Sequence, residues 1–331
     1  MNTELAARYP EPLDAIVLAG TDNNPRRMIQ GQNKAFLEIG GSVLVLRVVE
    51  ALLAAGSVRQ IFVVGPAERL EDALADLDGD VSVVQQSGKM IANAWEAIHA
   101  SEARYRELSG ADDPQRPLLF LSSDLPLIST DAVDDFVRRC ALEEQQTGTT
   151  YSMLAGLAEE ASLKLYYPDE SGVGIVRPYV HLSNYRVRLA NIYVGRPRTL
   201  SNQQFLQTGF EHRKAEKWKN VLALSWRFLS QNGGMSAAWT TLRLQATLLA
   251  AKGQGASYNW LRKHNPPGRI EKVCGKVLGG TVRMVITPYG GLSLDADNEE
   301  DFRILSERFE EWLRVGPVES AARRGLDSRQ S

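Results

Sequence analysis

The sequence of 331 residues contains only two cysteines, Cys140 and Cys274, and no CxxC motif. So few thiols form neither a disulfide framework nor a thiolate zinc site, and they are typical of a reducing compartment. The histidines also lack the spacing of metal ligands, which favours surface or structural roles for them. There are four of them: His99, His181, His212 and His264.

Long apolar runs and an excess of positive charge are also missing. No uninterrupted run of about 18 apolar residues occurs, and the N-terminal segment MNTELAARYPEP has no apolar signal core. We therefore expect a cytoplasmic protein without a membrane span. The formal net charge of -2 gives no overall basic field, so we expect a small-molecule ligand and no nucleic-acid partner. The lack of a GxxxxGKS or GxxxxGKT motif disfavours a P-loop kinase or ATPase.

Up to about residue 145, short apolar runs alternate with amphipathic segments. The pattern predicts strands at Ala15–Leu18, Ile61–Val64, Val81–Val84 and Leu118–Leu121. It predicts helices at Val43–Ala55, Pro66–Leu77, Met90–Ala100 and Thr130–Gln146. This alternation is typical of an α/β protein with a doubly wound, mostly parallel sheet. Ligands of such sheets bind beyond the carboxyl ends of the strands.

The pattern changes after about Thr149. Short runs at Tyr151–Leu154, Lys164–Tyr167 and Leu189–Val194 predict strands of a mixed sheet. Residues 201–263 are predicted to form a helical insertion. The parallel pattern then resumes with a helix at Ile270–Leu278, a strand at Thr281–Ile286 and a final helix to about Leu313. We expect one domain over residues 1–315 that includes the insertion, followed by a disordered tail over residues 316–331.

The first strand leads into a polar loop within DAIVLAGTDNNPRRMIQGQNKAFLEIGG. Gly20 allows close approach of a ligand to the backbone, and the loop supplies Arg26, Arg27 and Lys34. Guanidinium groups bind phosphate in a bidentate manner, and an ammonium adds a compact charge. The loop is therefore a candidate for binding a triphosphate.

Two acidic motifs could hold a metal ion. Asp124 follows an apolar strand in LLFLSSDLPLIS, and Asp295 and Asp297 lie two residues apart in SLDADNEEDF. In extended geometry the latter two would point to one face, just before a helix with Glu300 and Asp301 in its first turn. Magnesium commonly takes one or two carboxylates together with phosphate oxygens and water. We therefore predict that Mg²⁺ binds between the two motifs.

These motifs resemble those of the molybdenum-cofactor guanylyltransferase-like (MobA-like) NTP transferases, which have a glycosyltransferase-A-like fold. LAG, RRM and NKAFLEIGG are similar to the family's opening motif, which implies triphosphate-binding roles for Arg27 and Lys34. LSSDLPLI is similar to its metal-binding aspartate motif, which implies that Asp124 binds the metal. LDADNEEDF is similar to its closing motif, which implies that Asp297 is the second metal ligand with Asp295 beside it. The resemblance covers residues 13–145 and 270–313.

The same resemblance suggests further binding residues. It implies contacts to the nucleotide from Leu18, Ala19 and Gly20, and from Asn93 in SGKMIANAWEAI. It also suggests that Asn191 in LANIYV contacts the acceptor. Ordinary hydrogen bonding at a helix or strand end is the alternative for Asn93 and Asn191. The sequence departs from the family in three ways: Thr21 replaces the second glycine of LAGG, the loop to Lys34 is longer, and Glu299 replaces the proline of the closing motif.

The sequence thus predicts a nucleotidylyltransferase that transfers NMP from an NTP to a phosphate or other oxygen nucleophile and releases pyrophosphate. Arg27, Lys34, Asp124 and Asp297 are its predicted catalytic residues. Two alternatives remain open: a metal-dependent glycosyltransferase of related fold, and a degenerate nucleotide-binding regulatory protein. The nucleotide base, the acceptor and the oligomeric state do not follow from the motifs.

The helical insertion contains RKAEKWKNVLALSWRFLS, in which apolar residues recur at helical spacing. They are Trp218, Leu222, Trp226 and Leu229. Packing against the body of the protein is the simpler interpretation of this face. The alternative is contact with a membrane surface or a partner groove, because basic residues cluster at the start of the segment.

Overall fold

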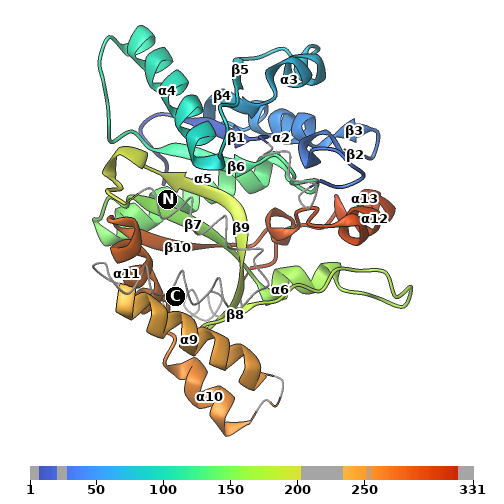
Figure 1. The fold of residues 1–331 in the computed structure, drawn as a ribbon, viewed down its shortest axis with the longest axis vertical. Coiled ribbons are helices and arrows are strands. Elements are labelled where there is room, and N and C mark those ends of the chain that lie inside the picture. The colour runs from blue at the N-terminus through green and yellow to red at the C-terminus, as the bar shows by residue number, and fades with distance from the viewer. Residues whose placement is uncertain (1–6, 21–27, 203–233, 252, 254, 320–331) are drawn as a thin grey trace.

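The structure is a computed structural model that describes residues 7–20, 28–202, 234–251, 253 and 255–319. A mixed sheet with helices on both faces dominates this part of the chain (Figure 1). Its strand order is β10-β7-β9-β6-β1-β4-β5, with β8 paired to β9. The strands are β1 (Leu13–Leu18), β4 (Val58–Gly65), β5 (Val81–Gln85), β6 (Leu118–Ser122), β7 (Met153–Glu159), β8 (Val180–His181), β9 (Arg186–Gly195) and β10 (Val282–Thr287).

Four of the seven strand pairs described in this sheet are parallel. Strand β1 lies between β4 and β6, β4 also pairs with β5, and β10 pairs with β7, all in parallel register. Strand β9 is antiparallel to β6, β7 and β8. A small antiparallel pair, β2 (Glu38–Ile39) and β3 (Ser42–Val43), lies outside this sheet. The prediction of an α/β fold with a mostly parallel sheet is confirmed.

Helices cover both faces of the central strand. Ala15 and Val17 of β1 pack in the cluster formed with α2 and α5, whereas Ile16 packs in the cluster formed with α4. Burial on both faces explains the continuous apolar run in the sequence. The helices are α2 (Leu44–Leu53), α3 (Ala67–Leu74), α4 (Met90–Ser109), α5 (Thr130–Thr147), α6 (Glu160–Leu163), α9 (Gly234–Ala251), α10 (Ala256–Lys263), α11 (Pro267–Leu278), α12 (Glu299–Glu307) and α13 (Phe309–Trp312).

The later part of the chain includes one wrong prediction. The strand predicted at Lys164–Tyr167 is instead a 3-10 helix, Lys164–Tyr166, that directly follows α6. The Tyr166 ring packs edge-on against Trp312, with 5.2 Å between the ring centroids, so its burial comes from a helix far along the chain. A short apolar run alone does not distinguish a strand from a buried helical turn.

Two other boundaries differ from the sequence pattern. The strand predicted at Tyr151–Leu154 is displaced to β7. Helix α4 continues past Ala100 to Ser109 and ends at Gly110, whose φ of 71° is the left-handed conformation of a glycine C-cap. The charged residues in the second half of α4 hid this extension, because they face solvent and leave no apolar period.

The described part of the insertion is helical, as predicted. Helices α9 and α10 project from the sheet near β8, at the lower end of the molecule in Figure 1. The predicted face of Trp218, Leu222, Trp226 and Leu229 lies outside the described residues, and so do residues 320–331 of the predicted tail. Among the helices that the structure describes, none is long and apolar enough to cross a bilayer.

Candidate functional site

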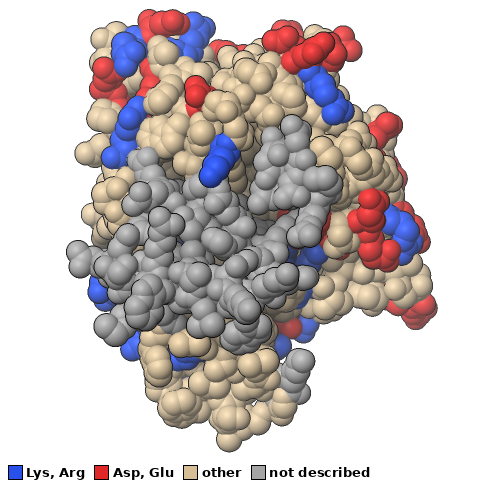
Figure 2. Space-filling view, viewed as in Figure 1, with Lys and Arg blue, Asp and Glu red and all other residues tan. Residues whose placement is uncertain are grey.

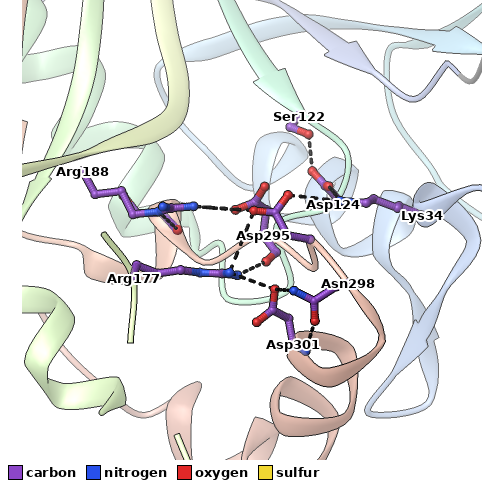
Figure 3. Close-up of polar contacts among 10 residues, drawn as sticks. Lys34, Ser122, Asp124, Arg177, Arg188, Asp295, Asn298 and Asp301 are labelled. Atoms are coloured by element: carbon purple, nitrogen blue, oxygen red, sulfur yellow. Dashed lines mark hydrogen bonds and ion pairs between the residues drawn. The ribbon is translucent and has the colours of Figure 1, made fainter. Parts of the chain in front are cut away.

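The predicted lysine and both acidic motifs meet at one place, beyond the carboxyl end of β6 (Figure 3). Lys34 Nζ lies 3.4 Å from Asp124 Oδ2 and 3.5 Å from Asp297 Oδ1. Asp295 is buried beside them. Lys34 and Asp297 are far apart in the sequence, yet they belong to one cluster of charges.

Strand β6 and the strand beside it position Asp124. The amide of Ser123 donates to the carbonyl of Leu18 at the end of β1, which joins the two strand ends. The hydroxyl of Ser122 donates a hydrogen bond to Asp124 Oδ1, so the carboxylate has a fixed orientation. Leu125 is buried immediately afterwards and anchors the turn. The carboxylate therefore points away from the core and into the cluster.

Asn33, which sequence reasoning missed, positions Lys34. Its amide nitrogen donates to the carbonyl of Ala19 at 2.7 Å, and its amide oxygen caps the 3-10 helix of residues 34–36 by accepting from the Ala35 amide at 3.1 Å. An asparagine before a helix is a recognisable N-cap signal. The bond from Asn33 to Ala19 ties the residue before Lys34 to the end of β1, where the predicted phosphate loop begins.

Gly20 and Asn93, which were predicted to bind the nucleotide, also lie together. A Cβ atom on Gly20 would come within 2.6 Å of Asn93 Nδ2. Asn93 Oδ1 accepts from the amides of Ser87 and Gly88 at 2.9 and 3.0 Å. Asn93 therefore orders the loop before α4 and holds it against the end of β1, where only a glycine leaves enough space.

Two arginines that the sequence analysis did not identify complete the cluster. Arg188 Nη2, from β9, lies 3.6 Å from Asp295 Oδ1 and 3.6 Å from Asp297 Oδ2. Its Nε donates to the carbonyl of Ser293 at 3.2 Å. Arg177 donates to the carbonyl of Asp295 and to Asp301 Oδ2, both at 2.8 Å. The arginines therefore fix the segment that carries Asp295 and Asp297.

Asn298 fixes the other end of this segment. Its side chain accepts from the Asp301 amide at 2.9 Å and donates to Asp301 Oδ2 at 2.8 Å, which caps α12. Asp301 is thus shared by Asn298 and Arg177. We infer that the acidic first turn of α12 has a structural role, as its N-terminal position favours carboxylates.

We expect Arg177→Met to lower the free energy of unfolding by about 3 kcal/mol, because it leaves buried Asp301 without its guanidinium partner. Chemical denaturation measures this change. Arg303→Met, which removes exposed ion pairs with Glu300 and Glu307 on the same helix, is the control and should change stability little. Equal effects of the two variants would contradict the positioning role of Arg177.

Three carboxylates lie close together in the cluster, beside the cationic groups of Lys34, Arg177 and Arg188. Burial is the main cause that raises the pKa of Asp295, to about 6, and the neighbouring Asp124 and Asp297 carboxylates act in the same direction. Lys34 and Arg188 oppose the shift only in part. A further positive charge beside these carboxylates would favour their ionised forms.

The same cluster fits a divalent cation. Asp124 and Asp297 already share one cationic group, the Lys34 ammonium, and both offer the oxygen ligands that Mg²⁺ prefers. Within the described residues, no group of three or more His, Cys, Asp and Glu side chains is placed to hold a metal unaided. A metal here would therefore take two carboxylates and complete its coordination with phosphate oxygens and water.

Several residues of the first loop fall outside the described part of the chain, whereas Asn191 and Lys89 lie within it. Arg26, Arg27 and Thr21 fall outside the described residues. Asn191 is half-buried within β9, three positions beyond Arg188, and takes no part in the contacts described above. Lys89 is exposed at the N-cap of α4.

The histidines that the structure describes make local contacts. His181 Nδ1 lies 2.9 Å from the hydroxyl of Tyr258, and His264 Nδ1 lies 2.8 Å from the carbonyl of Trp260. His99 stacks at a tilt on Trp95. These contacts agree with the structural roles that the sequence favoured, and His212 lies outside the described residues.

Comparison with known proteins finds a family match in the first half of the chain. Residues 15–164 match the family model of the MobA-like NTP transferase domain. The match includes Lys34 and Asp124, whereas Asp295 and Asp297 lie beyond it. The resemblance read from the sequence motifs is confirmed.

Two similar proteins extend the comparison. A 2-C-methyl-D-erythritol 4-phosphate cytidylyltransferase from Rhodococcus jostii (strain RHA1) is 36% identical over 58 residues, which are 18% of this chain and 26% of that enzyme. A hypothetical transferase from Thermus thermophilus superposes with a TM-score of 0.56 at 19% identity, and the match covers 88% of this chain and 99% of that one. The second likeness supports the fold well beyond the region that matches the family model.

Proposed function

We propose that the protein is a nucleotidylyltransferase. The observation that carries the proposal is the meeting of Lys34 with Asp124 and Asp297 beyond the end of β6, in a chain whose residues 15–164 match the family model of the MobA-like NTP transferase domain. A cation between two carboxylates suits a triphosphate with its metal better than a neutral ligand. Residues 1–315 would form the catalytic unit, with residues 201–263 as its insertion.

In the proposed reaction an oxygen of the acceptor attacks the α-phosphorus of an NTP. The bond between the α-phosphorus and the bridging oxygen breaks, pyrophosphate leaves, and NMP becomes attached to the acceptor. The acceptor is a small molecule with a phosphate or another oxygen nucleophile. Such transfer requires chiefly positioning and neutralisation of charge, so no nucleophile from the protein is needed.

The residues of the cluster would divide the work. Leu18, Ala19 and Gly20 would offer backbone at the end of β1, with Asn93 ordering the loop beside them. Lys34 would turn from the carboxylates toward the departing phosphates, and Arg27 would assist it. Asp124 and Asp297 would hold Mg²⁺, which when bound supplies neutralisation of phosphate charge. Asn191 would lie on the acceptor side.

The proposal has a direct test. The protein would be incubated with each of the four NTPs, labelled at the α-phosphorus, in a small-molecule extract of cells. Transfer of the label to a new product together with an equal amount of pyrophosphate is the expected result. Consumption of a sugar nucleotide with release of a nucleoside diphosphate would instead favour the glycosyltransferase. Nucleotide binding without turnover would favour the regulatory protein.

A further inference from the structure

Helix α9 and the following helix α10 present apolar side chains to solvent. Trp239, Leu242 and Leu249 of α9 are 67%, 61% and 69% exposed, and Trp260 of α10 is 62% exposed. The three residues of α9 are three and seven positions apart, so they lie on one face of the helix. The projection that these helices form shows mainly uncharged side chains on the face seen in Figure 2.

The inner face of α9 combines two threonines with Leu244, which packs against the cluster of Leu157, Leu182, Val187 and Ile270. Thr240 and Thr247 are buried, and the hydroxyl of Thr247 both donates to the carbonyl of Arg243 at 2.7 Å and accepts from Asn265 Nδ2 at 3.0 Å. The same amide group of Asn265 donates to the carbonyl of His181 in β8 at 3.3 Å. These bonds fix the rotation of α9, so its apolar face points outward because of the fold.

Helix α10 is fixed in the same way. The hydroxyl of Tyr258 lies 2.9 Å from His181 Nδ1, and Arg262 Nε donates to the carbonyl of Leu182 at 2.6 Å. Tyr258 and Arg262 thus face inward and contact β8 and the residue that follows it. Trp260 remains on the outer side.

This part of the chain also carries a large excess of positive charge. Residues 234–280 contain a single acidic residue, Glu271, which is buried and accepts from the Met284 amide in β10. They contain seven basic ones: Arg243, Lys252, Arg262, Lys263, Arg269, Lys272 and Lys276. The whole chain has a net charge of -2, so the charge is segregated to this region.

Part of the positive charge lies on the outer face of α11. Arg269, Lys272 and Lys276 are exposed and spaced by three and four positions, which places them in one row. Helix α11 packs against α9. Arg269 also lies close enough to Arg243 of α9 to lower the pKa of that guanidinium, although burial is the larger cause. Like charges therefore gather where the two helices meet.

We propose that α9, α10 and the basic row of α11 form a peripheral docking face for an anionic lipid bilayer. Tryptophan and leucine enter the boundary between headgroups and acyl chains, and lysine and arginine attract anionic headgroups. A bilayer satisfies both features of this face at once, whereas nucleic acid offers no apolar surface for Leu242 and Leu249. In a two-fold dimer the same patch meets itself, which would bring the two positive regions together.

The test is sedimentation of the full chain with vesicles of phosphatidylcholine alone and of phosphatidylcholine mixed with phosphatidylglycerol. Binding to the mixed vesicles only, weakened by salt, is expected. The double variants Trp239→Ser with Leu249→Ser, and Lys272→Glu with Lys276→Glu, should each lower binding at least about tenfold. Leu108→Ser, and Arg104→Glu with Arg106→Glu, change exposed residues of α4 and should bind like the parent.

Several results would overturn the docking face. The parent could fail to bind anionic vesicles, it could bind both kinds of vesicle equally, or the charge variant could bind as well as the parent. If the serine variant does not fold, the charge variant still decides the test. Lys272 and Lys276 are exposed on α11, so their replacement should leave the fold intact. A parent dimer that dissociates in the serine variant, measured by light scattering, would assign the face to a second copy. The inference does not depend on the proposed transferase activity.

Discussion

Asp124→Asn should lower the rate of nucleotidyl transfer by on the order of a thousandfold while the protein stays folded. Asparagine keeps the shape of the side chain and can still accept from the Ser122 hydroxyl, but it removes the negative charge that faces Lys34. A metal bound by a neutral amide would be held weakly, and the several kcal/mol that a metal contributes to phosphate chemistry would be largely lost. Lys34 keeps Asp297 as a partner, so no buried charge is left alone.

The control for this variant is Asp131→Asn. Asp131 is exposed in the first turn of α5, a few residues after Asp124 in the chain, and takes no part in the cluster. Rates would be measured by pyrophosphate release, and folding by circular dichroism and thermal denaturation. Full activity of a folded Asp124→Asn protein would remove Asp124 from the mechanism.

Lys34→Ala should weaken NTP binding by about ten- to hundredfold and NMP binding much less. The proposed contact of Lys34 is to the departing phosphates, which NMP lacks. Loss of a charge-assisted hydrogen bond costs on the order of 1.5 to 3 kcal/mol, which gives this range. Isothermal titration with both nucleotides measures it. Equal losses for NTP and NMP would place Lys34 elsewhere.

The same variant should bind a divalent cation more tightly when no nucleotide is present. Lys34 lies within 3.5 Å of both Asp124 and Asp297, so its ammonium competes with a metal for these carboxylates. Manganese binding can be followed by electron paramagnetic resonance. Lys89→Ala, at the exposed N-cap of α4, is the matched control. A decrease in metal affinity in Lys34→Ala would contradict the shared use of the two carboxylates.

The sequence predicted those parts of the fold and site that local pattern determines. The run Ala15–Leu18 indicated a central strand because apolar side chains on both faces of β1 are buried by helices. Asp124 could be placed beyond the end of β6 because an apolar strand ends directly before it. The meeting of Asp124 with Asp297 followed from the order of motifs that resemble one family, and the structure brings both to Lys34.

The arginines of the site could not be predicted in this way. Arg188 contacts the carboxylates because β9 runs antiparallel between β6 and β7, a pairing that depends on residues far along the chain. Arg177 comes from an irregular segment with no period, so nothing in its neighbours distinguishes it from a surface arginine. The Lys164–Tyr166 helix escaped prediction for a related reason, since Trp312 buries Tyr166 from a distant position.

We propose that Asp124, Asp297 and Lys34 together hold a metal-bound triphosphate. A crystal structure with Mn²⁺ and an NTP whose bridging oxygen between the α- and β-phosphorus is replaced by a methylene group tests it most directly. We expect one anomalous peak between the carboxylates of Asp124 and Asp297, with Lys34 turned toward the β- and γ-phosphates. Manganese and triphosphate bound away from these carboxylates, with Lys34 still between them, would contradict it.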